Sequence, residues 1–171
     1  MKLLYLITVF TLLSQIASAQ ELFEVNKTYQ SNRHSYSITV PKSFEQSDAN
    51  RANIDLKFVD KFGSSIMVNV TPRQDQEYGI TAHDYTEDLF ENSIRQFSPN
   101  YDIVRSEKII ISGQKAFIVE SKGSHPDLRT MECHLFYNDK AYVITNIAPT
   151  TRYSRYRNLF HKVITSLDLM K

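Results

Sequence analysis

The 171-residue chain has no tryptophan, a single cysteine and only four glycines. Because Cys133 is alone, no disulfide can form within the chain, and the fold has to be stabilised by its hydrophobic core. The glycines lie singly along the sequence, at Gly63, Gly79, Gly113 and Gly123. Phosphate-binding loops need several glycines close together, so this spacing argues against a nucleotide-binding motif.

Motifs for covalent catalysis and metal binding are also missing. No serine lies in a G-x-S-x-G sequence, and Cys133 lacks the local signatures of cysteine hydrolases. Cys133 and His134 are neighbours on an expected strand, so their side chains point to opposite faces and cannot hold one metal ion together. The histidines show no paired zinc-ligand spacing. We therefore expect no catalytic residue, no cofactor and no metal site, although a site assembled from dispersed residues stays open.

The one long apolar run is at the N-terminus, directly after a basic residue. Lys2 precedes Leu3–Leu13, and the small residues Ala17-Ser18-Ala19 follow shortly afterwards. This order is typical of a secretory signal peptide, and the run is shorter than the roughly 20 apolar residues of a membrane-spanning helix. We predict a signal peptide at residues 1–19, cleaved between Ala19 and Gln20. No cysteine near this site could carry a lipid anchor.

Residues 20–171 are the size of one domain and carry balanced charge. The whole chain has 20 Lys and Arg against 19 Asp and Glu, and Lys2 is the only charged residue in the predicted signal peptide. A net charge near zero gives no electrostatic reason to expect nucleic acid or an anionic membrane as a partner. We therefore expect one soluble exported domain, periplasmic or extracellular, with no transmembrane segment.

Apolar and polar residues alternate along much of the mature chain, with the period of half-buried strands. The alternation is clearest in residues 54–58 and 66–70, which a turn containing Gly63 joins as a hairpin. In the first of these strands, Asp55 and Lys57 fall on the polar side. Further strands are expected at residues 22–29, 35–40, 101–112, 114–122, 129–137 and 141–148, with polar loops at 42–51 and 72–80.

Two helices are expected, at residues 82–97 and 150–167, and each has an apolar stripe. The first has Thr81 as its expected N-cap. Because short loops join most of the strands, the sheet should be antiparallel, which gives an α+β fold with an antiparallel β-sheet flanked by helices. The expected stripes are Tyr85, Leu89, Ile94 and Phe97 in the first helix and Tyr153, Tyr156, Phe160, Val163, Ile164 and Leu167 in the second.

Three arginines, Arg152, Arg155 and Arg157, crowd the first two turns of the second helix, where the helix dipole favours anions. One interpretation is an ordinary basic surface, paired with acidic residues of the first helix. The other is a contact with an acidic partner or an anionic head group. Tyr153 and Tyr156 fit the buried stripe better than a stacking surface for nucleic acid. These arginines are the candidate partner-binding residues.

Several short segments resemble PsbP-like domains. They are Tyr36–Pro41 with Phe44, residues 109–116, residues 142–145, and the closing pattern of Tyr156, Phe160 and Ile164–Ser166. The family includes the photosystem extrinsic protein PsbP, a Ran-binding nuclear import factor and DcrB-type bacterial envelope proteins. The resemblance implies an α/β/α sandwich around an antiparallel sheet, over nearly all of residues 20–171. It also implies a binding or assembly role without known catalysis, and it supplies no catalytic residues. The lipid-anchoring cysteine of many bacterial relatives is missing.

Together, these observations predict an exported accessory or binding protein that is not an enzyme and acts through contacts with another protein. The alternative is a small-ligand carrier or a hydrolase whose site is assembled from dispersed residues. A deep apolar pocket with converging polar groups would favour the alternative. A packed interior with a broad exposed patch would favour the binding protein.

Overall fold

The structure is a computed structural model that describes residues 26–49, 51–73, 86–97, 102–122 and 125–170. The predicted signal peptide and its cleavage site between Ala19 and Gln20 lie outside the described residues, as does the start of the strand expected at 22–29. In the described part of the chain, no helix has the length and apolar character needed to cross a membrane.

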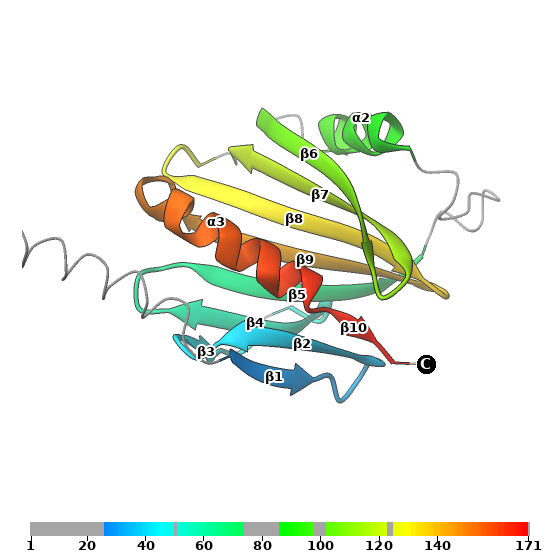
Figure 1. Cartoon of the computed structure of the whole chain (residues 1–171), viewed down its shortest axis with the longest axis horizontal. Helices are drawn as coiled ribbons and strands as arrows, with labels where there is room; N and C mark the ends of the chain where they lie inside the picture. The colour runs from blue at the N-terminus through cyan, green and yellow to red at the C-terminus, as the bar shows by residue number, and fades with distance from the viewer. Residues whose placement is uncertain (1–25, 50, 74–85, 98–101, 123–124, 171) are drawn as a thin grey trace, which may run out of the picture.

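The described residues form two antiparallel sheets and two helices (Figure 1). The large sheet has the spatial order β3-β4-β5-β9-β8-β7-β6, and the small sheet has the order β1-β2-β10. The strands of the large sheet are β3 (Phe44–Gln46), β4 (Ile54–Asp60), β5 (Ser65–Pro72), β6 (Asp102–Ile111), β7 (Gln114–Lys122), β8 (Leu128–Tyr137) and β9 (Lys140–Pro149). The remaining elements are β1 (Asn26–Gln30), β2 (Tyr36–Pro41), β10 (Asp168–Leu169), α2 (Glu87–Phe97) and α3 (Thr150–Thr165).

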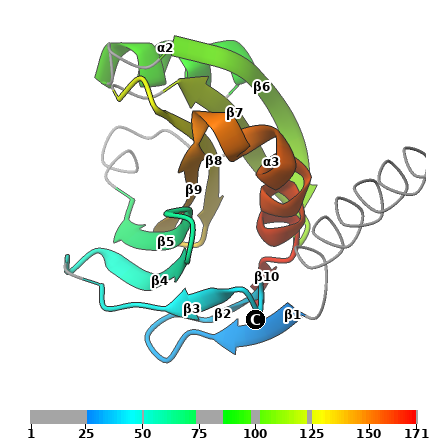
Figure 2. The ribbon, with the colours of Figure 1, turned by 90° about the vertical axis from the view of Figure 1, so that its left-hand side faces the viewer.

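The large sheet curves around one side of α3, and the small sheet lies below that helix in Figure 2, next to β3 and β4. Helix α2 packs on the opposite face of the large sheet, where Phe90 stacks on Phe117 with ring centroids 4.9 Å apart. The expected antiparallel α+β fold is therefore confirmed. The protein is richer in sheet than the expected sandwich, because a second sheet takes part in covering the core.

The main core fills the space between the large sheet, α3 and β2. All six residues expected in the apolar stripe of the second helix are buried. The helix itself ends at Thr165, two residues before the expected end, and Leu167 is buried beyond it. From β2, the side chains of Tyr36, Ile38 and Val40 enter the same core.

Two short strands lie where no strand was expected. β3 lies within the expected loop at 42–51 and pairs with β4, with Phe44 opposite Asp60. β10 follows the last helix and pairs with β2, with Leu169 opposite Tyr36. Strands of three and two residues are too short to show a clear alternation, and only their pairing in space defines them.

The first helix differs from its prediction. α2 begins at Glu87, and the Thr86 hydroxyl caps it by accepting a hydrogen bond from the Leu89 backbone N–H at 3.2 Å. Leu89 was expected in the buried stripe, but it is 45% exposed, whereas its neighbour Phe90 is 5% exposed. Since consecutive helical residues are about 100° apart, the buried face lies one residue away from the expected one. Outside the described residues lie the expected cap Thr81 and the side chains of Tyr85, Ile94 and Phe97.

Asp55 was expected on the polar side of its strand, but its side chain is only 4% exposed. The pairing register of β4 shifts between Ile54 and Leu56, which breaks the regular alternation at this point. The Asp55 carboxylate accepts hydrogen bonds from the Ser31 hydroxyl at 2.6 Å and the Tyr36 hydroxyl at 2.7 Å. Asp55 therefore ties the small sheet to the large one.

Candidate functional site

The first two turns of α3 lie between two hollows of the protein surface. The first hollow, of about 370 Å³, is lined by Lys42, Ser43, Glu45, Val59, Asp60, Lys61 and Phe62. We call the second hollow, of about 490 Å³, the arginine groove. It is lined by Val104, Arg105, Glu120, Arg129, Thr150, Tyr153, Ser154 and Arg157.

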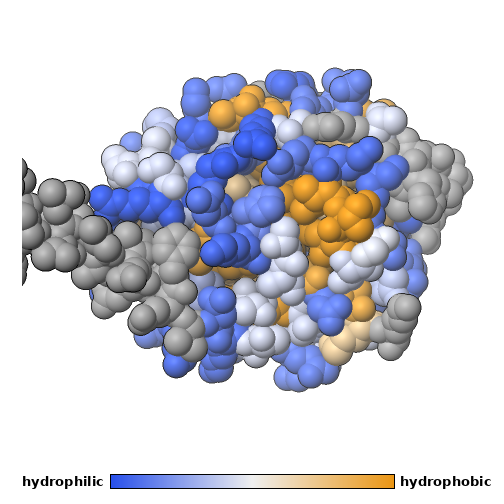
Figure 3. Space-filling view, viewed as in Figure 1, coloured by the Kyte–Doolittle hydropathy of each residue, from blue (hydrophilic) through white to orange (hydrophobic). Residues whose placement is uncertain are grey.

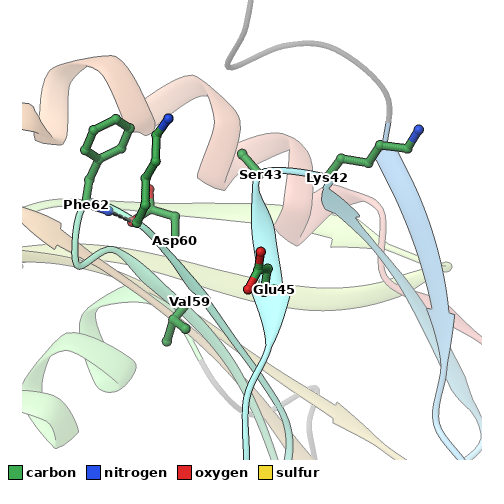
Figure 4. A pocket seen from close by; sticks show the side chains of 7 residues that line it. Lys42, Ser43, Glu45, Val59, Asp60 and Phe62 are labelled. Carbon is green, nitrogen blue, oxygen red and sulfur yellow. Dashed lines mark hydrogen bonds between the residues drawn. The ribbon is translucent and has the colours of Figure 1, made fainter.

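The hollow beside β3 and β4 has equal numbers of acidic and basic side chains in its lining. Figure 4 shows Asp60 and Phe62 on one side of it and Ser43 and Glu45 on the other, with Lys42 directed away. Two residues of α3 support its wall. The Arg152 guanidinium lies 4.2 Å from the Phe62 ring centroid, and the Tyr156 hydroxyl donates to the Asp60 carboxylate.

The arginine groove is organised around Glu120, a β7 carboxylate that is 4% exposed on the core face of the sheet. Arg157 donates to Glu120 through Nη2 at 2.6 Å and through Nε at 2.9 Å. The Tyr153 hydroxyl donates to the same carboxylate at 3.1 Å. Tyr153 and Arg157 reach it together because residues four apart lie on one face of a helix.

Charges in the groove follow from this arrangement. Burial, and then the negative charge of Glu120, raise the pKa of Tyr153 above its ordinary value. The hydrogen bond to Glu120 raises the pKa of Arg157. Tyr153 therefore stays a neutral donor and Arg157 a cation near neutral pH.

Arg129 and Arg105 complete the basic lining of the groove. The Arg129 guanidinium lies 5.0 Å from the Tyr153 ring centroid. Its Nε atom is buried and makes no hydrogen bond to the described residues. Arg105 pairs with Glu107 at 3.0 Å, and the His161 imidazole lies 3.4 Å from the same Glu107 carboxylate.

The structure separates the three arginines that the sequence singled out. Arg157 lies in the arginine groove, Arg152 lies beside the first hollow, and Arg155 is exposed and lines neither. The partner of Arg157 is Glu120 of β7, whereas one interpretation expected acidic residues of the first helix. Figure 3 shows hydrophilic residues around the first turns of α3 and a hydrophobic area nearer the other end of the helix.

Arg105, Arg129 and Glu120 were missed, because they lie on separate strands and form no motif. The alternation of side chains along β8 could have identified Arg129. This residue has the same parity on β8 as the buried residues Met131 and Cys133, which places it on the core face of the sheet. A charged residue at such a position needs a partner or a ligand.

Cys133 and His134 lie on opposite faces of β8, as expected. Cys133 is fully buried in the main core, and burial raises the pKa of its thiol to about 12. The His134 ring lies 4.7 Å from that of Phe90, on the face that α2 covers. Among the described residues, no group of three or more His, Cys, Asp or Glu side chains could hold a metal ion.

Serine, histidine and aspartate also meet at the loop between β1 and β2. The Ser31 hydroxyl donates to Asp55, and its oxygen accepts from the backbone N–H groups of Arg33 at 3.1 Å and His34 at 2.9 Å. The His34 Nε2 atom lies 4.0 Å from Asp55. Because Ser31 donates to a carboxylate and not to an imidazole, it lacks the base that activates a serine nucleophile. The cluster fastens the loop to β4.

The chain is similar to known proteins in both its sequence pattern and its fold. Residues 24–169 match the family model described as PsbP. A search of the curated proteins found no match.

Three solved structures are similar to the chain. Cyanobacterial PsbP (CyanoP) from Synechocystis sp. PCC 6803 has a TM-score of 0.61 at 16% identity, with 84% of this chain and 92% of that chain covered. LpqN of Mycobacterium tuberculosis, involved in cell envelope biogenesis, has a TM-score of 0.61 at 7% identity, with 86% and 87% covered. The Saccharomyces cerevisiae Ran-binding protein Mog1p has a TM-score of 0.54 at 13% identity, with 86% and 96% covered.

These structural similarities show a shared fold, which agrees with the family match. The resemblance expected from the short sequence segments is thereby confirmed. The match extends from the segment before β1 to the end of β10, so it includes every strand and helix described here. The chain belongs to the PsbP family.

Proposed function

We propose that this chain is an exported, non-catalytic accessory protein that binds another protein through the arginine groove. The observation that carries the proposal is the open hollow beside the first turns of α3, where Arg105, Arg129 and Arg157 converge. Each arginine comes from a different element of the fold, namely β6, β8 and α3. The fold therefore brings together three cationic side chains that are far apart in the sequence. Arginine is also enriched in protein interfaces.

The chemistry of the groove favours binding over catalysis. Its one carboxylate, Glu120, already accepts hydrogen bonds from Arg157 and Tyr153. Its hydroxyl-bearing residues, Thr150, Tyr153 and Ser154, have no histidine beside them in the groove lining. Both hollows at the first turns of α3 are lined mostly by charged and hydroxyl-bearing side chains, whereas the alternative of a small-ligand carrier or hydrolase requires a deep apolar pocket.

The family context points the same way. Mog1p is described as a Ran-binding protein and LpqN as involved in cell envelope biogenesis, so binding roles and envelope processes both occur on this fold. Export is inferred from the signal-peptide pattern of residues 1–19. Mass spectrometry of the protein from its own cells is expected to find an N-terminus at Gln20, and an intact N-terminus at Met1 would contradict export.

Site-specific crosslinking tests the binding surface. A photoreactive residue is placed at Ser154, which is exposed in the groove, and in a control protein at Gln46, which is exposed on β3. We expect irradiation in the envelope fraction to link Ser154 to a specific protein, and excess unlabelled protein to compete it away. If the crosslinks at Ser154 and Gln46 are the same, the groove is not the binding surface.

A further inference from the structure

We infer that the arginine groove binds a carboxylate of its protein partner, supplied by an acidic side chain, and that Arg129 is the main contact. The inference rests on the proposed function and adds the chemistry of recognition. Two of the three arginines in the groove are already paired with carboxylates, and the third is not. Arg157 is paired with Glu120 and Arg105 with Glu107. Arg129 has no carboxylate within 4.0 Å among the described residues.

Arg129 also lacks a hydrogen-bond acceptor for its Nε donor among the described residues. Its Nε donor is buried without an acceptor in the described part of the chain, which is an unfavourable state for an arginine. The guanidinium rests against the Tyr153 ring, which holds it in place from one side. A carboxylate can accept from Nε and one terminal nitrogen together. Because Nε is covered in the free protein, the Arg129 side chain has to move before a ligand can accept from this edge.

The groove residues favour a singly charged ligand on a peptide. Once Arg157 and Arg105 are paired, one positive charge is left uncompensated, which matches one carboxylate better than a phosphate dianion. Val104 is a 48% exposed apolar residue in the wall of the same groove. An acidic residue with an apolar neighbour would use both features, whereas a free anion would use only the charge.

Nuclear magnetic resonance with short peptides tests this inference directly. The ligand is an acetylated and amidated four-residue peptide with one glutamate beside one leucine, and its matched control has glutamine in place of glutamate. We expect the glutamate peptide to shift the Arg129 Nε–H signal and the amide signals of Tyr153 and Ser154. The glutamine peptide should bind at least about tenfold more weakly, because the charge-assisted hydrogen bonds are lost.

Variants assign the effect to Arg129. Arg129→Gln should weaken binding of the glutamate peptide at least about tenfold. Arg129→Lys should give an intermediate loss, because lysine keeps the positive charge but cannot donate two parallel hydrogen bonds to one carboxylate. Arg155→Gln is the matched control, since Arg155 is exposed and lines neither hollow. Its binding should equal that of the wild type. Arg129→Lys keeps the test valid if Arg129→Gln does not fold.

Three results would overturn the inference. The first is the absence of groove shifts at about 10 mM glutamate peptide, a concentration chosen because single ion pairs are weak. The second is equal binding by the wild type and Arg129→Gln. The third is a set of stronger shifts from inorganic phosphate than from the peptide. If Arg129→Gln still crosslinks its partner at Ser154, the proposed function stands and only the carboxylate chemistry fails.

Discussion

Arg157 and Glu120 form an ion pair in which Nη2 of the arginine lies 2.6 Å from the carboxylate, although one residue belongs to α3 and the other to β7. The Arg157 side chain is partly exposed, while that of Glu120 is almost fully buried. Such a pair adds little net stability, because removing the carboxylate from water offsets most of the attraction. Its effect is to fix where α3 lies on the sheet, and with it the shape of the arginine groove.

We predict that Arg157→Gln destabilises the protein by about 2–4 kcal/mol, because Glu120 is left buried with Tyr153 as its remaining donor. The lower part of the range reflects the partial exposure of the arginine. Urea unfolding measures the change. Arg155→Gln is the control and should change stability by less than about 0.5 kcal/mol, as an exposed residue does. Equal stability of both variants would show that the ion pair is not formed in solution.

Most of the fold follows from the sequence, because its main elements are long enough to show a period. All six residues of the stripe predicted for the second helix are buried, but Leu159, which is also buried, was not among them. The hairpins were placed by alternation between short loops. The errors lie where a local pattern is short or broken. β3 and β10 are too short to alternate, and the register shift in β4 reverses the side on which Asp55 lies.

The candidate site was less predictable, because it depends on how separate elements meet. Proximity in sequence grouped Arg152, Arg155 and Arg157, but a helix directs these residues to different sides. Arg105 and Arg129 join Arg157 only because β6 and β8 lie on either side of β7. No pattern along a single segment contains that information.

Phe160→Ala is predicted to cost about 3–5 kcal/mol, since truncating a buried phenylalanine leaves a cavity between α3 and the sheet. Phe160 is fully buried, and its ring centroid lies 5.5 Å from that of Tyr156. The midpoint of urea unfolding reports the loss. Leu89→Ala on α2 is the matched control, because Leu89 is 45% exposed and should lose much less. An unchanged midpoint for Phe160→Ala would mean that α3 is not docked on the sheet.

The thiol of Cys133 should be unreactive in the folded protein. Burial raises its pKa from 9.0 to about 12, so the thiolate is about a thousandfold rarer at pH 8 than in an exposed cysteine. Labelling with iodoacetamide, followed by mass spectrometry, should be negligible in buffer and complete in denaturant. Rapid labelling of the folded protein would show that the core around β8 opens easily.

Alkaline solution should destabilise the protein. The pKa of Cys133 rises from 9.0 to about 12 on folding, and burial together with the hydrogen bond to Asp60 raises that of Tyr156 from 10.0 to about 12. Raised values mean that the unfolded chain loses these protons first, so the stabilisation is complete below pH 9 and declines between pH 9 and 12. Thermal unfolding from pH 8 to 11 measures the decline, and Cys133→Ala should reduce it. A melting temperature that stays constant to pH 11 would contradict the prediction.

Asp55 is the carboxylate that joins the two sheets. Asp55→Asn should destabilise the protein by about 1–3 kcal/mol, because the amide cannot accept both hydroxyl hydrogen bonds as strongly as a carboxylate does. Tyr36→Phe removes one of these donors and should cost about 1 kcal/mol. Since both changes act on one hydrogen bond, the double variant should lose less than the two single losses together.

The control for this cycle is Lys57→Gln with Tyr36→Phe. Lys57 also lies on β4 but makes no hydrogen bond to Tyr36, so these two losses should add. Because the tyrosine donates to Asp55 from β2, the size of the coupling measures how strongly the small sheet is held to the large one. Additive losses for Asp55→Asn and Tyr36→Phe would mean that the core residues of β2, and not this hydrogen bond, hold the two sheets together.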